Sequence, residues 1–166
     1  MSRVQSSIVL WCSDALFDGR PFRILTVVDC HSRESLAIVV RTNFRAYQVV
    51  EELDRLMRKR GKPKSIRCDN GPEFAGRMLD QWAYLNGVAI DFSRPGKPTD
   101  NSFIESFNAR LRAECLNASW FISMSDARDR IEEWRCHYNE ERPHSALGNL
   151  TPKDFIEQAH RVRKVA

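Results

Sequence analysis

Apolar and polar positions along the chain form two alternating patterns, one typical of strands and one of helices. Short runs rich in β-branched and apolar residues, bounded by turn residues, predict strands at 22–30, 35–41, 64–69 and 88–92. Asp18-Gly19 is a hairpin signal before the run at 22–30, so a first strand is expected to precede this turn. That second run is expected to be a central strand.

Between and after these runs, apolar residues recur at helical spacing. Helices are expected from Asn43, as the N-cap, to about Arg60, over 74–86, around Glu105, from Asp126 to Arg142, and briefly after Thr151-Pro152. The expected core faces are Tyr47, Val50, Leu53 and Met57; Met78, Trp82 and Leu85; Ile104, Phe107, Leu111 and Cys115; and Ala127, Ile131, Trp134 and Tyr138, with Trp120 also in the core. The order β-β-β-α-β-α-β-α-α predicts an α/β fold, a mixed five-stranded sheet with helices on both faces.

Two acidic residues occupy positions where chemistry is possible. Asp69 closes the fourth strand just before Asn-Gly-Pro, and Glu105 lies within a helical pattern, on a polar face shared with Asn108 and Arg112. A strand-end Asp beside a helical Glu can hold a divalent metal between hard oxygen ligands. Taken singly, a turn role would explain Asp69 and a solvated helix position would explain Glu105.

Three motifs surround these two carboxylates. They are Asp-Asn-Gly-Pro-Glu-Phe at 69–74, Pro-Gly-Lys-Pro at 95–98 and Asn-Ser-Phe-Ile-Glu-Ser-Phe-Asn at 101–108, with Arg112 seven residues past Glu105. In this order they resemble the DDE transposase core, closest to the OrfB-type insertion-sequence transposases with a retroviral-integrase-like catalytic domain. The resemblance covers about residues 14–152. It implies a ribonuclease-H-like fold, Mg²⁺ or Mn²⁺ as cofactor, and catalytic and metal-binding roles for Asp69 and Glu105.

The first of the family's three carboxylates is not evident. Counting back along the resembling segment places it at Leu10, which offers no oxygen. Asp14 and Asp29 are the alternative metal ligands, but Asp14 lies four residues further on, about 13 Å along a strand. The sequence therefore predicts a core that is impaired or inactive, with residues 1–12 as an atypical segment, 13–150 as the integrase-like core and 151–166 as a C-terminal helix and tail.

Basic residues predict a nucleic-acid surface. Seven lie between Arg55 and Arg67 with no acidic residue among them, and this surface is expected beside Asp69, although such a run is often only a solvated face. The resemblance adds positions in the Tyr-Asn-x-x-Arg-Pro-His segment. The predicted nucleic-acid-binding residues are Arg58, Lys59, Arg60, Lys62, Lys64, Arg112, Arg142 and His144. Residues expected to steady substrate or metal-bound water are Asn70, Glu73, Asn101 and Asn108.

Composition excludes several other classes. The net charge is +4, and the five cysteines show no Cys-x-x-Cys spacing, which argues against a zinc site and a secreted disulfide scaffold. No apolar run reaches membrane-spanning length, so a cytoplasmic protein without membrane contact is expected.

The resemblance implies DNA transposition, with strand cleavage and strand transfer at insertion-sequence ends by two-metal chemistry. It further implies insertion-sequence and target DNA as partners, a homo-oligomer, and a helix-turn-helix reader on an OrfA-type partner or a fused upstream domain. Two alternatives stay open. One is an inactive remnant that keeps the fold and non-specific DNA binding, which Leu10 favours; the other is a ribonuclease-H-like nuclease.

Overall fold

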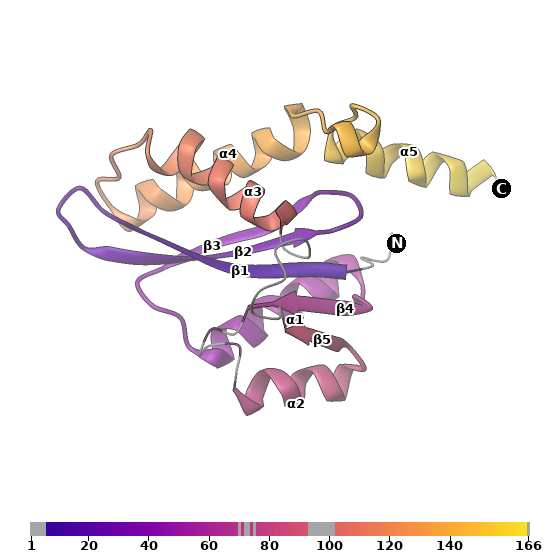
Figure 1. The fold of residues 1–166 in the computed structure, drawn as a ribbon, viewed down its shortest axis with the longest axis horizontal. Coiled ribbons are helices and arrows are strands. Elements are labelled where there is room, and N and C mark those ends of the chain that lie inside the picture. The colour runs from indigo at the N-terminus through magenta and orange to yellow at the C-terminus, as the bar shows by residue number, and fades with distance from the viewer. Residues whose placement is uncertain (1–5, 70, 72–73, 75, 93–101, 166) are drawn as a thin grey trace.

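A five-stranded mixed sheet divides the molecule into two helical layers (Figure 1). The computed structural model describes residues 6–69, 71, 74, 76–92 and 102–165. The sheet has the order β3-β2-β1-β4-β5. Its strands are β1 Ser6–Ala15, β2 Pro21–Asp29, β3 Ser35–Arg41, β4 Ser65–Cys68 and β5 Ala89–Phe92. The predicted fold class is therefore confirmed.

β1 pairs with one neighbouring strand in the antiparallel sense and with the other in the parallel sense. It is antiparallel to β2, from Ser7 opposite Asp29 to Ala15 opposite Pro21, and parallel to β4, from Ser6 opposite Ser65 to Val9 opposite Cys68. β2 also pairs with β3, and β4 with β5. β1 crosses the boundary expected at residues 12 and 13 without a break.

Helices cover both faces of the sheet. They are α1 Ala46–Arg60, α2 Arg77–Asn86, α3 Ser102–Leu111, α4 Met124–Glu141 and α5 Pro152–Val165, with a π-turn η2 Arg112–Leu116 and a 3₁₀ turn η3 Ser145–Leu147. α1 and α2 lie on one face and α3 and α4 on the other, whereas α5 extends past the sheet (Figure 1). Among the described residues, no helix combines the length and apolar composition needed to cross a bilayer.

β2 contributes to the core on both faces. Leu25 and Val27 pack with α1 and α2, while Phe22 and Ile24 pack beneath η2 and α4. All four are at most 1% exposed. Such two-sided burial explains why this strand is an almost continuous apolar run rather than an alternating one.

The phase of two helices differs from the sequence prediction. The N-cap of α1 is Arg45, whose backbone N–H donates to the Gln48 side chain, and not Asn43. In α1 the residues Val49, Leu53 and Leu56 are buried, the predicted Val50 and Met57 pack partly buried against the same core, and Tyr47 is 45% exposed.

In α2 the buried residues are Leu79, Trp82 and Ala83, whereas Met78 and Leu85 are 45% and 81% exposed. Trp120, expected in the core, is 70% exposed and lies against Phe17, with ring centroids 5.3 Å apart. α3 keeps its predicted face, because Ile104, Phe107 and Leu111 are all buried.

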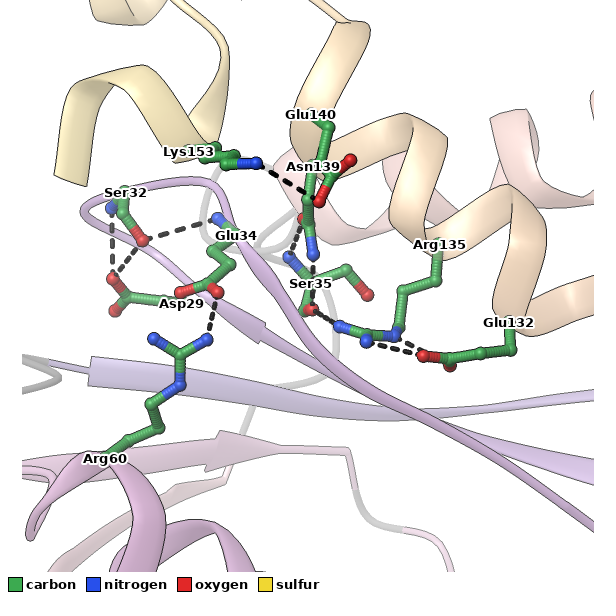
Figure 2. Close-up of polar contacts among 10 residues, drawn as sticks. All are labelled: Asp29, Ser32, Glu34, Ser35, Arg60, Glu132, Arg135, Asn139, Glu140 and Lys153. Atoms are coloured by element: carbon green, nitrogen blue, oxygen red, sulfur yellow. Dashed lines mark hydrogen bonds and ion pairs between the residues drawn. The ribbon is translucent and has the colours of Figure 1, made fainter. Parts of the chain in front are cut away.

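Polar contacts fix the turn between β2 and β3 and hold it to α4 (Figure 2). Oδ2 of Asp29 accepts hydrogen bonds from the backbone N–H and hydroxyl of Ser32, at 3.0 and 2.6 Å. Ser35 exchanges two hydrogen bonds with the buried side chain of Asn139, at 2.8 and 3.0 Å. Glu34 forms an ion pair with Arg60 of α1. The turn is thus attached to both helical layers.

Candidate active site

Asp69 follows directly after β4, beside the middle of β1. Because Val9 lies opposite Cys68 in the parallel pair, the next residues, Leu10 and Asp69, are level with each other. Val9 and Cys68 both belong to the core on the α1 and α2 face, so alternation along the strands assigns Leu10 and Asp69 to the α3 face. Oδ1 of Asp69 accepts a hydrogen bond of 2.9 Å from the backbone N–H of Gly71, which fixes the carboxylate in a turn.

α3 presents Glu105 over the same part of the sheet. Ile104 and Phe107 anchor the helix in a core cluster, and Leu10 packs against that cluster. Glu105 lies exposed in the first turn. One turn later, Oδ1 of Asn108 lies 3.3 Å from the hydroxyl of Thr26, which also donates to the carbonyl oxygen of Leu10 at 3.2 Å. Leu10 is therefore linked to Asp69 by strand register and to the helix of Glu105 by packing and hydrogen bonding.

The register does not bring Asp14 or Asp29 beside Asp69. Asp14 is opposite Phe22, four residues past Leu10, and its Oδ1 accepts from the backbone N–H of Ala15 at 2.9 Å. Asp29 is opposite Ser7, three residues before Leu10; the residue is 5% exposed, and its carboxylate accepts a hydrogen bond from Ser32. At about 3.3 Å per residue these offsets are about 13 and 10 Å.

The basic cluster of residues 58–64 occupies the other end of β4. α1 ends at Arg60 and a short loop leads into Ser65, whereas Asp69 follows the last residue of the strand. The expectation that the cluster lies beside Asp69 is therefore wrong, because close neighbours in sequence are separated by the length of the strand. Arg60 is also paired with Glu34, while the exposed members are Arg58, Lys59, Lys62 and Lys64.

The remaining predicted residues have diverse surroundings. Arg112 is half-buried and donates to the carbonyl oxygen of Ser13 at 2.9 Å and to the sulfur of Cys12 at 3.0 Å, so it fastens η2 to β1. Arg142 forms an ion pair with Glu114. Three predicted positions lie outside the described residues: Asn70, Glu73 and Asn101.

His144 shapes the turn before α5. Its backbone N–H donates to the carbonyl oxygen of Leu150, and its own carbonyl oxygen accepts from Leu147 and Asn149. Burial, and then the positive charges of three arginines, lower the pKa of the imidazole below 6.5; these are Arg110, Arg142 and Arg33. Both effects favour the neutral form of the imidazole over the charged form.

Two features of the site were not found in the sequence. Thr26 is completely buried and joins β1 to α3, and a single hydroxyl within an apolar strand was its only signal. Arg33 and Arg110 line one pocket with His144, although they are far apart in the chain.

Comparisons with known proteins agree with this architecture. Two models, both described as integrase core domain, match residues 5–98 and 86–152. An uncharacterized 31.7 kDa protein of insertion element IS407 from Burkholderia multivorans is 51% identical over 142 residues, covering 86% of this chain and 51% of that protein. Transposase InsD for insertion element IS2D of Escherichia coli is 27% identical over 166 residues, covering 93% and 55%. The chain spans about half the length of these relatives.

A solved structure gives the same fold. The catalytic core domain of HTLV-2 integrase, solved in complex with magnesium in a trimeric form, superposes with a TM-score of 0.71 at 13% identity. The match covers 92% of this chain and 96% of that chain. This likeness shows the ribonuclease-H-like fold expected from the sequence.

Proposed function

Because the chain belongs to the integrase core domain family, with a core of the DDE transposase type, we propose that it is the catalytic core of an insertion-sequence transposase. Its reaction would be cleavage and joining of DNA strands at the ends of the element. We further propose that the chain, as its sequence stands, performs this reaction poorly. Asp69 and Glu105 are its catalytic carboxylates, and Leu10 occupies the position of the third.

The observation that carries this proposal is the register between β1 and β4. It places Leu10 level with Asp69, and the packing of Leu10 against the α3 cluster places it under the helix of Glu105. A carboxylate at position 10 would complete a set of three, each contributed by a different element. Leucine instead contributes an apolar side chain.

The residues fit a divalent metal only in part. Asp69 and Glu105 supply hard oxygen ligands of the kind that Mg²⁺ prefers. Within the described ranges, however, no three His, Cys, Asp or Glu side chains are arranged to hold a metal ion. Two such ions, when bound in a site of this kind, activate the attacking oxygen and stabilise the leaving oxygen. Two protein carboxylates are a weak set of ligands for that purpose.

The chain's own residues would hold the phosphodiester in place. The Gly71 hydrogen bond fixes the orientation of the Asp69 carboxylate, and the Thr26–Asn108 contact fixes the height of α3 above β1. Arg112, although tethered to Ser13, is proposed to offer its remaining N–H groups to a phosphate. Arg58, Lys59, Lys62 and Lys64 would contact flanking DNA from the far end of β4, where each contact adds affinity that falls with salt.

Leu10 also favours a second candidate, a remnant that keeps the fold and DNA binding but has lost catalysis. The two candidates differ in whether any strand cleavage survives. For the whole protein, we propose that a helix-turn-helix domain reads the DNA, either on a partner chain or fused upstream. We also propose that several copies assemble to join two DNA ends.

The experiment measures strand cleavage and joining on DNA with the element's terminal repeats, in Mg²⁺ or Mn²⁺, with the DNA-reading partner supplied. Leu10→Asp should raise the rate about a thousandfold, since the second Lewis-acid contact is worth several kcal/mol and each 1.36 kcal/mol is tenfold. Leu10→Asn is the matched control, because asparagine has nearly the same shape as aspartate but carries no charge. Glu105→Gln should abolish the gained activity.

Four outcomes are informative. Full activity in the unmodified chain would show that another residue supplies the third carboxylate. Residual but measurable activity supports an impaired transposase, and complete inactivity supports the remnant. Failure of Leu10→Asp to exceed Leu10→Asn would refute the assignment of position 10.

A further inference from the structure

A pocket of about 420 Å³ lies on the flank of α3 that faces away from Glu105. Phe103, Ser106 and Arg110, spaced three and four residues apart, line it from α3. Glu105 and Asn108 lie on the other flank, and the buried stripe of Ile104, Phe107 and Leu111 runs between the two. The turn at 143–149 and Arg33 from the β2–β3 turn complete the walls.

The charge of this pocket is positive, although Glu114 interacts with Arg110 at longer range. None of its lining residues is acidic. No carboxylate in the described part of the chain lies within ion-pairing distance of Arg33 or Arg110, whereas Arg142 nearby is paired with Glu114. The imidazole of His144 responds to this charge, because three arginines contribute to lowering its pKa. An anion would relieve the repulsion among these groups.

Arg33 is held in position before any ligand binds. The residue before it is fixed by Asp29 and the residue after it by Arg60, as Figure 2 shows for Ser32 and Glu34. Arg33 itself has a φ of 60°, a conformation that costs a non-glycine residue about 1–2 kcal/mol. Its guanidinium carbon lies 4.0 Å from the centre of the Phe103 ring. The turn therefore holds the guanidinium of Arg33 at one fixed position beside α3.

The chemistry of the walls selects a phosphate rather than a base. Guanidinium groups match phosphate oxygens with paired N–H donors, and the side chains of Ser106, Ser145 and Asn149 add hydrogen-bonding groups. Base recognition by stacking would need a free aromatic face. Arg33 covers the face of Phe103, while Phe107 and Tyr138 are only 1% and 2% exposed.

We propose that Arg33 and Arg110 bind a backbone phosphate of the DNA strand, on the flank of α3 opposite Glu105. The proposal rests on the proposed function only in taking DNA as the ligand. An α-helix with its side chains is about 10–12 Å across, so DNA held on both flanks would be fixed relative to the Glu105 carboxylate. Arg33 and Arg110 are thus positioning residues and do not touch the reacting atoms.

The first experiment measures DNA binding without catalysis. Duplex affinity of the full chain is followed by fluorescence anisotropy against salt, with EDTA present. For Arg33→Gln/Arg110→Gln, the loss of one phosphate contact should lower the slope of log affinity against log salt by about 0.9. At about 0.1 M salt the affinity should fall about 8-fold, since one phosphate contact contributes about 0.9 log units per tenfold change in salt below about 1 M.

The matched control is Arg161→Gln/Arg163→Gln, which removes the same charge from the exposed end of α5. It should change the affinity less than about threefold, the effect of less than one phosphate contact. Equal losses in both double variants, or no duplex binding by the unmodified chain, would overturn the proposal. Circular dichroism and thermal melting establish that each variant is folded, and Arg110→Lys should retain part of the affinity.

The second experiment separates DNA from small anions. Inorganic phosphate is titrated at constant ionic strength, and the pKa of His144 is followed by NMR of the ring. Bound phosphate should raise that pKa, because it offsets the positive charges of Arg110, Arg142 and Arg33. Tyr138 also faces the imidazole, with ring centroids 5.1 Å apart.

An effect of phosphate without the predicted loss of duplex affinity would assign the pocket to a small anion and overturn the DNA proposal. Absence of both effects would refute anion binding in this pocket altogether. Because neither measurement needs a metal ion or a reaction, a chain that fails to cleave DNA can still pass both tests.

Discussion

Leu10→Asp should make the stability of the protein depend on divalent metal. Leu10 is half-buried against the α3 cluster, and its replacement loses about 1–2 kcal/mol of apolar burial. The new carboxylate lies level with Asp69 and under the helix of Glu105, which costs about a further 1–3 kcal/mol without a metal ion. A total of about 3 kcal/mol corresponds to a fall in Tm of about 6–12 °C for a chain of this size.

Magnesium should restore most of that loss. A ligand at about one hundred times its Kd stabilises the folded state by about 2.7 kcal/mol, or roughly 5–11 °C in Tm. The assay is differential scanning fluorimetry of three proteins, the unmodified chain, Leu10→Asp and Leu10→Asn, each with EDTA and across a Mg²⁺ series at fixed ionic strength. Only Leu10→Asp should show the full recovery of Tm on adding Mg²⁺. Leu10→Asn loses a similar amount of apolar packing but adds no charge that could bind the ion.

Two results would refute this reasoning. One is recovery of Leu10→Asn equal to that of Leu10→Asp, which would trace the effect to non-specific ion binding. The other is a metal-dependent rise in the unmodified chain as large as in the variant, because that chain would then already hold a complete site. In either case position 10 would have no special relation to Asp69 and Glu105.

Three further predictions follow from individual contacts. Thr26→Val should lower the free energy of unfolding by about 1–2 kcal/mol in urea titrations, because it leaves the Asn108 side chain and the Leu10 carbonyl without their shared partner. His144 has a lowered pKa, so its contribution to stability is present above pH 6.5 and lost as the pH falls; His144→Gln should lack this loss in unfolding measured between about pH 7 and 5. Neutralising Lys59 and Lys62 should lower the salt slope of DNA binding by about 1.8 without changing Tm by more than about 2 °C.

The sequence predicted the elements better than their exact orientation. The strands predicted at 22–30 and 35–41, which correspond to β2 and β3, and the buried face of α3 follow from local apolar patterns, which a single sequence contains. In α1 and α2 the predicted faces were only partly right, because both helices contain more apolar residues than the sheet can cover. Leu53 and Trp82 are buried as predicted, whereas Tyr47, Met78 and Leu85 are exposed. Trp120 was misplaced for a similar reason, since its partner is the exposed ring of Phe17.

The site could be predicted only where it depends on neighbouring residues. For the proposed site, the motifs around Asp69 and Glu105 indicated these two carboxylates, and counting back along the family resemblance indicated Leu10 as the third position. The distance of the basic cluster from Asp69 depends on the direction of β4, and the approach of Arg33 to Arg110 depends on a turn with positive φ. Both features depend on tertiary contacts, and a local sequence pattern does not identify the residues that make those contacts.

The two-sided burial of β2 has a consequence for how the protein unfolds. Its side chains belong to the core on both faces of the sheet, so neither helical layer can detach without exposing part of this strand to water. The two layers should therefore melt in one cooperative transition rather than as separate subdomains. In native-state hydrogen exchange, the backbone amides from Ile24 to Val28 should open only with the whole molecule, and the last helix, α5, should open long before them.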